Sequence, residues 1–317
     1  MRYLFLFCIL IISGILFAQN KSTFIYSIKG SDTLRMDVYS PSNLDNNDSL
    51  PVLLWMHGGG FSGGSRDNGD EVKLAKYAAN HGYIGISISY RLTRKGSETG
   101  FGCDCPAKDK IETFRNATID FLDAAQYLID HNRELKANVN QIIAGGSSAG
   151  AEGVLSAVYM KDYYVTDKSK YQDIHFAGLL SLAGAMVDPS YISLRTAVPT
   201  VLFHGSEDNL VPFAKGAHHQ CSNSKPGFLI LYGSEVISAK LYALDKSFYF
   251  NEVKGGKHEI SGIPFDQLDD IFTFFNETIF RKNIIQTSQD HIVRSFYFSR
   301  LLKCILIKIP TFDKFRF

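Results

Sequence analysis

The stretch IIAGGSSAGA, residues 142–151, decides the fold because it surrounds two adjacent serines with small residues directly after a branched apolar run. This pattern predicts a strand that ends in a sharp turn, followed by a helix. Gly146, Ser148 and Gly150 fit G-x-S-x-G, in which a serine occupies a strained strand-to-helix turn where bulky neighbours would clash. Ser147 fits a looser pattern and is the rival nucleophile. A glycine-rich helix start that binds an anion through backbone N–H groups is the alternative reading.

Strands and helices alternate on both sides of this stretch. Continuous apolar strands separated by helices indicate a mostly parallel sheet covered on both faces. Neither an internal repeat nor a linker divides the chain, so one large α/β domain is expected. The expected strands are residues 22–29, 33–39, 51–56, 83–90, 139–144, 176–182, 199–203 and 248–253, and the expected helices are 72–81, 114–129, 149–160, 235–246 and 265–279.

The residues that follow the strands carry the chemistry, because ligand sites of open α/β sheets lie beyond the carboxyl ends of the strands. After the strand 51–56 comes HGGGF, residues 57–61. The N–H groups of Gly58 and Gly59, together with that of Ala149, can stabilise the oxyanion of a tetrahedral intermediate. A glycine triplet alone would be consistent with a plain turn, but its place upstream of the serine turn favours the oxyanion hole.

An acid and a histidine follow two later strands. Asp208, with Glu207 as its rival, follows the strand 199–203 and can orient an imidazole. His258 follows the strand 248–253 in the motif GGKHE and can accept the proton of a serine. The remaining histidines are expected to be structural or solvated, to shape loops, or to lie in loops near the site: His57, His81, His131, His175, His204, His218, His219 and His291.

The composition is that of an ordinary globular protein, with a formal net charge of +1, so no nucleic-acid partner is expected. Residues 281–317 differ from the rest, with eight Lys or Arg against two Asp. This basic and apolar extension is either a segment that contacts a membrane surface or a partner, or an extension without a role.

The first 18 residues read as a signal peptide, with Arg2, an apolar run over residues 3–17 and a cleavage site after Ala18. An uncleaved anchor is the alternative. Export would place the protein outside the cell or in the periplasm.

Disulfides persist in such compartments, and four cysteines remain besides Cys8. Cys103 and Cys105 are too close in sequence to pair without strain. One of them is expected to pair with Cys221, and the pair assigned is Cys105–Cys221. Free buried thiols are the alternative, and no metal site is expected.

With these residues in place, the chain resembles the α/β-hydrolase superfamily, specifically the hormone-sensitive-lipase-like carboxylesterases and bacterial esterases of the acetylxylan or feruloyl type. The resemblance covers residues 22–280 and implies Ser148 as nucleophile, His258 as general base and acid, Asp208 as its orienting partner, and no metal or organic cofactor. It divides the chain into a signal peptide (1–18), a catalytic domain (19–280) and the extension (281–317). The motifs are HGGGF, SYRL (89–92), GSSAGA (146–151), HGSEDNLVP (204–212) and GGKHE (255–259).

The expected function is that of a serine carboxylesterase that hydrolyses short acyl esters, acetyl or hydroxycinnamoyl, with small-molecule or polysaccharide-linked esters as substrates. Residues 183–198 leave little room for a lid, while the longer loops 93–110 and 214–233 should border the pocket. Two alternatives stay open. A serine peptidase of the prolyl-oligopeptidase kind would need a large N-terminal region to restrict access, and a noncatalytic member of the fold would normally lack the serine or the histidine.

Overall fold

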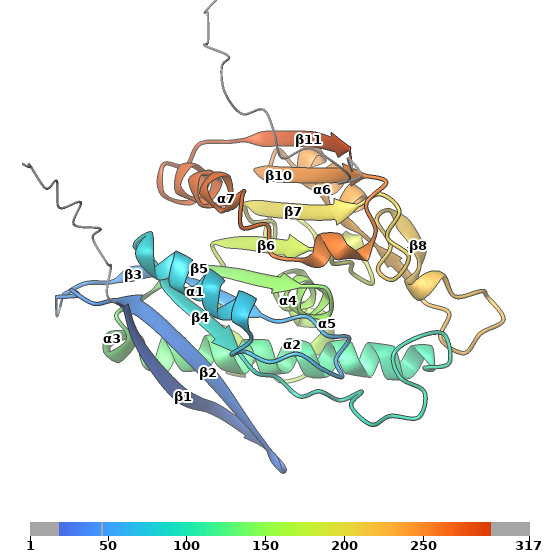
Figure 1. Cartoon of the computed structure of the whole chain (residues 1–317), viewed down its shortest axis with the longest axis horizontal. Helices are drawn as coiled ribbons and strands as arrows, with labels where there is room; N and C mark the ends of the chain where they lie inside the picture. The colour runs from blue at the N-terminus through green and yellow to red at the C-terminus, as the bar shows by residue number, and fades with distance from the viewer. Residues whose placement is uncertain (1–18, 46, 293–317) are drawn as a thin grey trace, which may run out of the picture.

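A nine-stranded sheet forms the centre of the computed structural model, which describes residues 19–45 and 47–292 (Figure 1). The strand order is β1-β2-β4-β3-β5-β6-β7-β10-β11. The two pairs β1–β2 and β2–β4 are antiparallel, and every other neighbouring pair is parallel. The strands are β1 (Gln19–Lys29), β2 (Asp32–Pro41), β3 (Leu50–Met56), β4 (Ile84–Ile88), β5 (Ala137–Ser147), β6 (Gly178–Leu182), β7 (Thr200–Gly205), β10 (Phe248–Lys254) and β11 (Gln286–Ile292).

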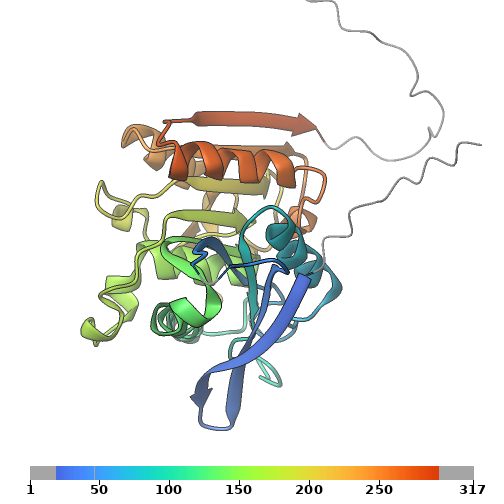
Figure 2. The same ribbon diagram turned by 90° about the vertical axis from the view of Figure 1, so that its left-hand side faces the viewer.

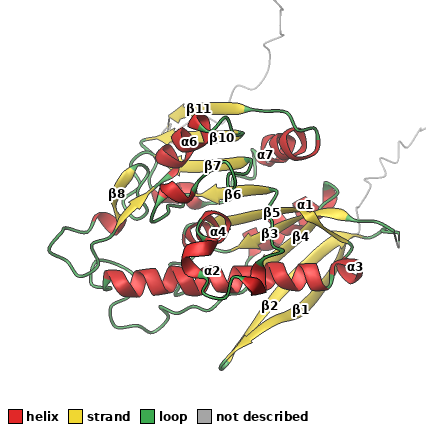
Figure 3. Ribbon diagram, turned by 180° about the vertical axis from the view of Figure 1, so that it is seen from behind, coloured by secondary structure: helices red, strands yellow, loops and turns green. Residues whose placement is uncertain are grey.

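Helices cover both faces of this sheet because side chains of one strand alternate between the faces. Leu53 and Trp55 of β3 pack in a cluster with residues of α1 and α7, whereas Leu54 and Met56 belong to the cluster that includes α2 and α4. Figure 3 shows α2 crossing the back of the sheet. The helices are α1 (Gly69–Asn80), α2 (Ala107–Asp130), α3 (Asn132–Leu135), α4 (Ala149–Tyr159), α5 (Lys161–Tyr164), α6 (Ser234–Ala243) and α7 (Leu268–Phe275).

The α/β-hydrolase fold predicted from the sequence is confirmed. Between β6 and β7 the chain forms only the short 3₁₀ turn η2 (Pro189–Tyr191), as expected for a short or absent lid. The remaining short elements are η1 (Ser169–Tyr171), β8 (Lys215–Ala217), η3 (His218–Gln220), β9 (Ile230–Tyr232), η4 (His258–Ser261) and the π-helical turn η5 (Asn276–Phe280). Within the described ranges, none of the helices combines the length and the apolar character that crossing a bilayer requires.

Both ends of the described chain lie at sheet edges. The hairpin β1–β2 projects from the body of the domain (Figure 2). At the opposite edge, β11 pairs in parallel with β10, so the ordered domain continues past residue 280, the boundary expected from the sequence. The signal peptide predicted for residues 1–18 and most of the basic extension, residues 293–317, lie outside the described residues.

Candidate active site

The serine turn adopts the strained geometry that its sequence predicts. Ser148 has φ 51° and ψ −121° between the end of β5 and the start of α4. Such a backbone costs on the order of 1–3 kcal/mol for a residue other than glycine. It is held in place because the Ser148 N–H donates to the Leu182 carbonyl at 2.8 Å and the Ser148 carbonyl accepts from the Glu152 N–H at 3.0 Å.

Close packing explains the small residues of this stretch. A Cβ atom on Gly150 would lie 2.1 Å from the carbonyl oxygen of Met56, and one on Gly146 would lie 2.5 Å from the backbone of Gly150. A larger side chain at Gly150 would push α4 away from β3, and one at Gly146 would push α4 away from β5. The glycines therefore allow the helix to start directly against the sheet, which exposes the Ser148 hydroxyl at the carboxyl end of the central strand β5.

The structure brings the three proposed catalytic residues together from three separate loops. Ser148 Oγ lies 2.7 Å from His258 Nε2, and His258 Nδ1 lies 2.8 Å from Asp208 Oδ2. Asp208 follows β7, and His258 opens η4 after β10. The Asp208 side chain is fully buried, whereas the His258 side chain is 19% exposed, so a substrate can approach the imidazole.

The charge of Asp208 fixes the tautomer of His258. Burial alone would raise the pKa of Asp208, but hydrogen bonds from His204 and His258 outweigh it and hold that pKa well below its usual value. At neutral pH the carboxylate can only accept hydrogen bonds, and its Oδ1 accepts two more from the N–H groups of Leu210 and Val211, at 2.8 and 3.0 Å. The Nδ1 of His258 must therefore carry the proton, which leaves Nε2 free to accept the proton of Ser148.

The two rival residues have other places in the structure. The Ser147 hydroxyl donates to the Ser261 carbonyl at 2.7 Å, which ties the serine turn to the loop that holds His258. Glu207 is exposed, although its backbone N–H donates to the Gly256 carbonyl at 2.8 Å. The geometry therefore favours Ser148 over Ser147 and Asp208 over Glu207.

The residues of the expected oxyanion hole line the same pocket as Ser148. A Cβ atom on Gly58 would lie 3.4 Å from the Cβ of Ser148, so the glycine loop passes directly beside the hydroxyl. Gly59 has φ +120°, a conformation that side chains rarely adopt. The N–H of Ala149 belongs to the first turn of α4, where backbone donors have no partner within the helix.

Two histidines shape the loops that they introduce, as the sequence analysis expects. His57 lies in ring contact with Tyr90, with 4.5 Å between ring centroids, and its Nδ1 lies 2.7 Å from the Gly58 carbonyl oxygen. The Nε2 atom of His204 lies 3.1 Å from the Val211 carbonyl oxygen and 3.4 Å from Asp208 Oδ2. Both rings thus support the backbone on which site residues depend.

A pocket of about 300 Å³ surrounds the Ser148 hydroxyl. The pocket also contains Glu152, which the sequence did not single out, and His218 and His219, which were expected as loop residues near the site. The spacing of four residues from Ser148 could have identified Glu152, because it places Glu152 in the first turn of α4, directly after the serine turn. The pocket is lined by Gly58, Gly59, Gly60, Phe101, Ser147, Ser148, Ala149, Glu152, Leu210, Val211, His218, His219, His258 and Ser261.

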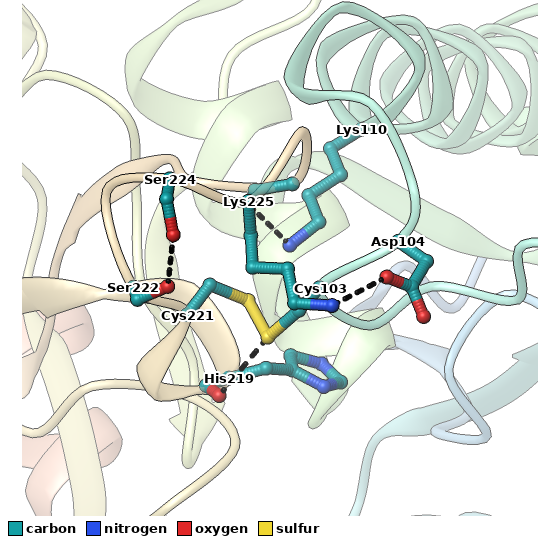
Figure 4. The surroundings of a disulfide bond; sticks show 9 residues. Cys103, Asp104, Lys110, His219, Cys221, Ser222, Ser224 and Lys225 are labelled. Atoms are coloured by element: carbon teal, nitrogen blue, oxygen red, sulfur yellow. Dashed lines mark hydrogen bonds and ion pairs between the residues drawn. A yellow bond between two sulfur atoms is a disulfide. The ribbon is translucent and has the colours of Figure 1, made fainter.

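A disulfide joins the two long loops beside this pocket (Figure 4). It forms between Cys103 and Cys221, with 5.2 Å between their Cα atoms, so the assigned pair Cys105–Cys221 is wrong. The reason is the register of the loops: the Gly227 N–H donates to the Cys103 carbonyl at 2.9 Å, which sets Cys103 opposite Cys221. Cys105 is a free thiol that is fully buried in the apolar core.

We expect this disulfide to stabilise the domain measurably. Because it closes a sequence separation of 118 residues, the Cys103→Ser variant should lose about 2–4 kcal/mol of unfolding free energy, measured by denaturant titration. The Cys105→Ser variant is the matched control, because it keeps the Cys103–Cys221 disulfide. The intact mass of this variant without reduction should therefore still be two hydrogens lower than the mass of the fully reduced chain. The assignment of the Cys103–Cys221 disulfide would be contradicted if the unreduced Cys103→Ser variant still lacked two hydrogens and if its Cys105 could be alkylated only after reduction.

Comparison with known proteins finds similarity to esterases and lipases. The BD-FAE family model matches residues 36–185. Mouse carboxylesterase 5A is 30% identical over 142 residues, which are 44% of this chain and 23% of that protein. The secreted triacylglycerol lipase LIP1 of Gibberella zeae is 26% identical over 299 residues, 88% of this chain and 49% of that protein. The chain thus spans about a quarter to a half of the length of these relatives.

Solved structures of a bacterial esterase share the fold. Thermogutta terrifontis esterase 2 phosphorylated by paraoxon superimposes with a TM-score of 0.59 at 17% identity, covering 82% of this chain and 94% of that one. The propionate-bound form of the same esterase gives a TM-score of 0.58 at 15% identity, covering 85% and 97%. At this level of identity the similarity establishes the fold.

Proposed function

We propose that the chain is a serine carboxylesterase with the α/β-hydrolase fold, in which Ser148, His258 and Asp208 carry out acyl transfer. One observation carries the proposal: an unbroken line of contacts runs from the Ser148 hydroxyl through the His258 ring to a buried carboxylate, at 2.7 and 2.8 Å. These separations are those of hydrogen bonds, which is the reach that a general base needs.

The reaction follows from this arrangement in two halves. His258 Nε2 takes the proton of Ser148 as Oγ attacks the ester carbonyl, and the N–H groups of Gly58, Gly59 and Ala149 stabilise the negative oxygen. The protonated imidazole then gives its proton to the departing alcohol, which leaves an acyl group on Ser148. In the second half, His258 Nε2 takes a proton from a water molecule as the water oxygen attacks the acyl-enzyme, and the imidazolium returns this proton to Ser148 Oγ when the acid leaves. Asp208 stays ionised throughout and stabilises the imidazolium.

Several observations support a small ester as substrate. A pocket of about 300 Å³ lies at the lower end of the volumes typical of ligand sites. The structural neighbour esterase 2 has been solved with propionate and with butyrate bound. The matched family model is that of a bifunctional acetylxylan/feruloyl esterase domain, so acetyl or hydroxycinnamoyl groups on carbohydrate are the substrates that we propose.

The compartment and the partner are part of this proposal. We propose that the protein is secreted or periplasmic, because the disulfide Cys103–Cys221 suits an oxidising compartment. Its partner would be a small-molecule or polysaccharide-linked ester. We also propose that residues 293–317, which are apolar and basic in sequence, contact a membrane surface, and deletion of these residues followed by a vesicle-binding assay tests that contact.

Chain-length preference tests the function. With aryl acetate, butyrate and octanoate as substrates, we expect kcat/KM for octanoate to fall at least tenfold below that for acetate or butyrate, since the short segment between β6 and β7 supplies no lid to cover a long acyl chain. Feruloyl esters are assayed in parallel. Absence of hydrolysis of every ester by a folded protein would favour a noncatalytic binding role, and a preference for octanoate would contradict the proposed short-acyl pocket.

A further inference from the structure

Two buried polar side chains line the pocket but take no part in the acyl-transfer steps. Glu152 is 2% exposed and His218 is not exposed at all. Glu152 lies one helical turn after Ser148, as the hydrogen bond from its N–H to the Ser148 carbonyl shows. Phe101 packs edge-on against the His218 ring, with 5.2 Å between centroids, and also lines the pocket. Both polar groups therefore lie beside the place where the ester must bind.

These side chains are close together yet unsatisfied. Glu152 Oε1 lies 3.3 Å from His218 Nε2, but the contact lacks hydrogen-bond geometry. Among the residues that the structure describes, neither of these atoms nor His218 Nδ1 has a hydrogen-bond partner. Buried polar atoms are rarely left unpaired, because their desolvation is not repaid. A ligand group that both donates and accepts hydrogen bonds would complete the pair.

The charge state of the pair indicates which ligand group it suits. Burial raises the pKa of Glu152 to about 8, an effect that His258 and Lys110 reduce and that Asp208 reinforces. Burial, with Lys110 and His258, lowers the pKa of His218 well below its usual value. At neutral pH Glu152 is therefore mainly a neutral acid and His218 a neutral imidazole. Such a pair complements an uncharged hydroxyl better than a carboxylate or an ammonium group.

We propose that Glu152 and His218 bind a hydroxyl group that the substrate carries close to its scissile ester. The inference rests on the proposed esterase function and narrows it to hydroxyl-bearing esters. The hydroxyl could belong to the alcohol, as on a partly acylated sugar ring, or to the acyl group, as in a 2-hydroxy acid. Glu152 and His218 would determine specificity, since His258 already performs the proton transfers.

The Cys103–Cys221 disulfide holds the segment that carries His218 in place. His218 begins η3, and the Cys221 N–H donates to the His218 carbonyl at 3.3 Å. On the other side, the sulfur of Cys103 lies 3.7 Å from the His219 carbonyl oxygen, a contact visible in Figure 4. The bridge therefore fixes the segment that carries His218 against the loop that contains Phe101.

Matched esters test the inference in two arms. In the first, trans-2-hydroxycyclohexyl acetate is compared with cyclohexyl acetate; in the second, cyclohexyl lactate is compared with cyclohexyl propionate. In each arm we divide kcat/KM for the hydroxylated ester by kcat/KM for the ester that lacks the hydroxyl. This ratio is then divided by the corresponding ratio of rate constants for hydrolysis by hydroxide, which corrects for the intrinsic reactivity of the two esters. The result is called the quotient below. In wild type we expect this quotient to exceed about 10 in one arm, since a site built for a hydroxyl disfavours the analogue that lacks it. The arm that responds identifies which side carries the hydroxyl.

Variants separate recognition from structure. Glu152→Leu and His218→Leu should bring the quotient close to one while cyclohexyl acetate is still cleaved. Glu152→Gln, which keeps a neutral donor and acceptor, should retain most of the preference, and the exposed Glu235→Leu should not change it. Quotients near one in both arms for wild type would overturn the inference and leave the esterase proposal intact. Failure of wild type to cleave any of the four esters would instead count against the esterase proposal itself.

Discussion

The Ser148→Ala variant should lose ester hydrolysis by a factor on the order of 10⁴ or more in kcat, because it removes the hydroxyl that contacts His258 Nε2 and forms the acyl-enzyme. Its Cβ atom remains, so the strained turn and its hydrogen bonds to Leu182 and Glu152 can persist. The fold should therefore be unchanged by circular dichroism. Hydrolysis of an aryl acetate under saturating conditions measures the effect, and the residual rate reports what binding and the oxyanion hole contribute alone.

The Ser147→Ala variant is the matched control, since it removes the neighbouring hydroxyl from the same turn. It loses only the hydrogen bond to the Ser261 carbonyl. A single hydrogen bond contributes about 1 kcal/mol, so we expect activity to fall by about tenfold at most. The opposite result, an active Ser148→Ala and an inactive Ser147→Ala, would transfer the nucleophile to Ser147.

The Asp208→Asn variant should reduce kcat by a factor on the order of 10³ to 10⁴ with little change in folding. The amide oxygen can still accept the backbone N–H groups of Leu210 and Val211. The amide nitrogen, placed toward His258 Nδ1, would favour the tautomer with the proton on Nε2, and the ring could then no longer accept the proton of Ser148. A pH profile of kcat alongside the rate distinguishes this loss from simple unfolding.

Glu207→Gln provides the comparison for that variant, because it neutralises the adjacent, exposed carboxylate. We expect its kcat to stay within about threefold of wild type, as for most surface substitutions. If Glu207→Gln were as inactive as Asp208→Asn is expected to be, the carboxylate assignment would be wrong.

Local chemistry made much of the fold and site predictable from the sequence. The small residues around Ser148 are required because α4 packs closely against the sheet. The order of apolar strands and helices places Ser148, Asp208 and His258 at the carboxyl ends of the parallel strands. Each of these features depends on neighbours in the sequence or on the general rule for parallel sheets. They do not depend on the detailed packing of distant segments.

What the sequence did not predict depends on contacts between distant segments. The choice of Cys103 over Cys105 follows from the hydrogen-bonded register between two loops more than a hundred residues apart. The strand β11 pairs in parallel with β10, from which η4, α7 and η5 separate it in the sequence. Likewise, no local pattern predicts that His218 lies beside Glu152, because this contact arises where α4 and η3 meet in space.

The central claim is that the hydroxyl of Ser148 is the group activated by His258. It is tested most directly by treating the protein with an organophosphate ester such as paraoxon and locating the covalent adduct by peptide mapping and mass spectrometry. We expect one phosphorylated residue, Ser148, in wild type and no adduct in a His258→Ala variant. Phosphorylation of Ser147 or of another residue, or an unmodified Ser148 in a preparation that hydrolyses esters, would contradict it.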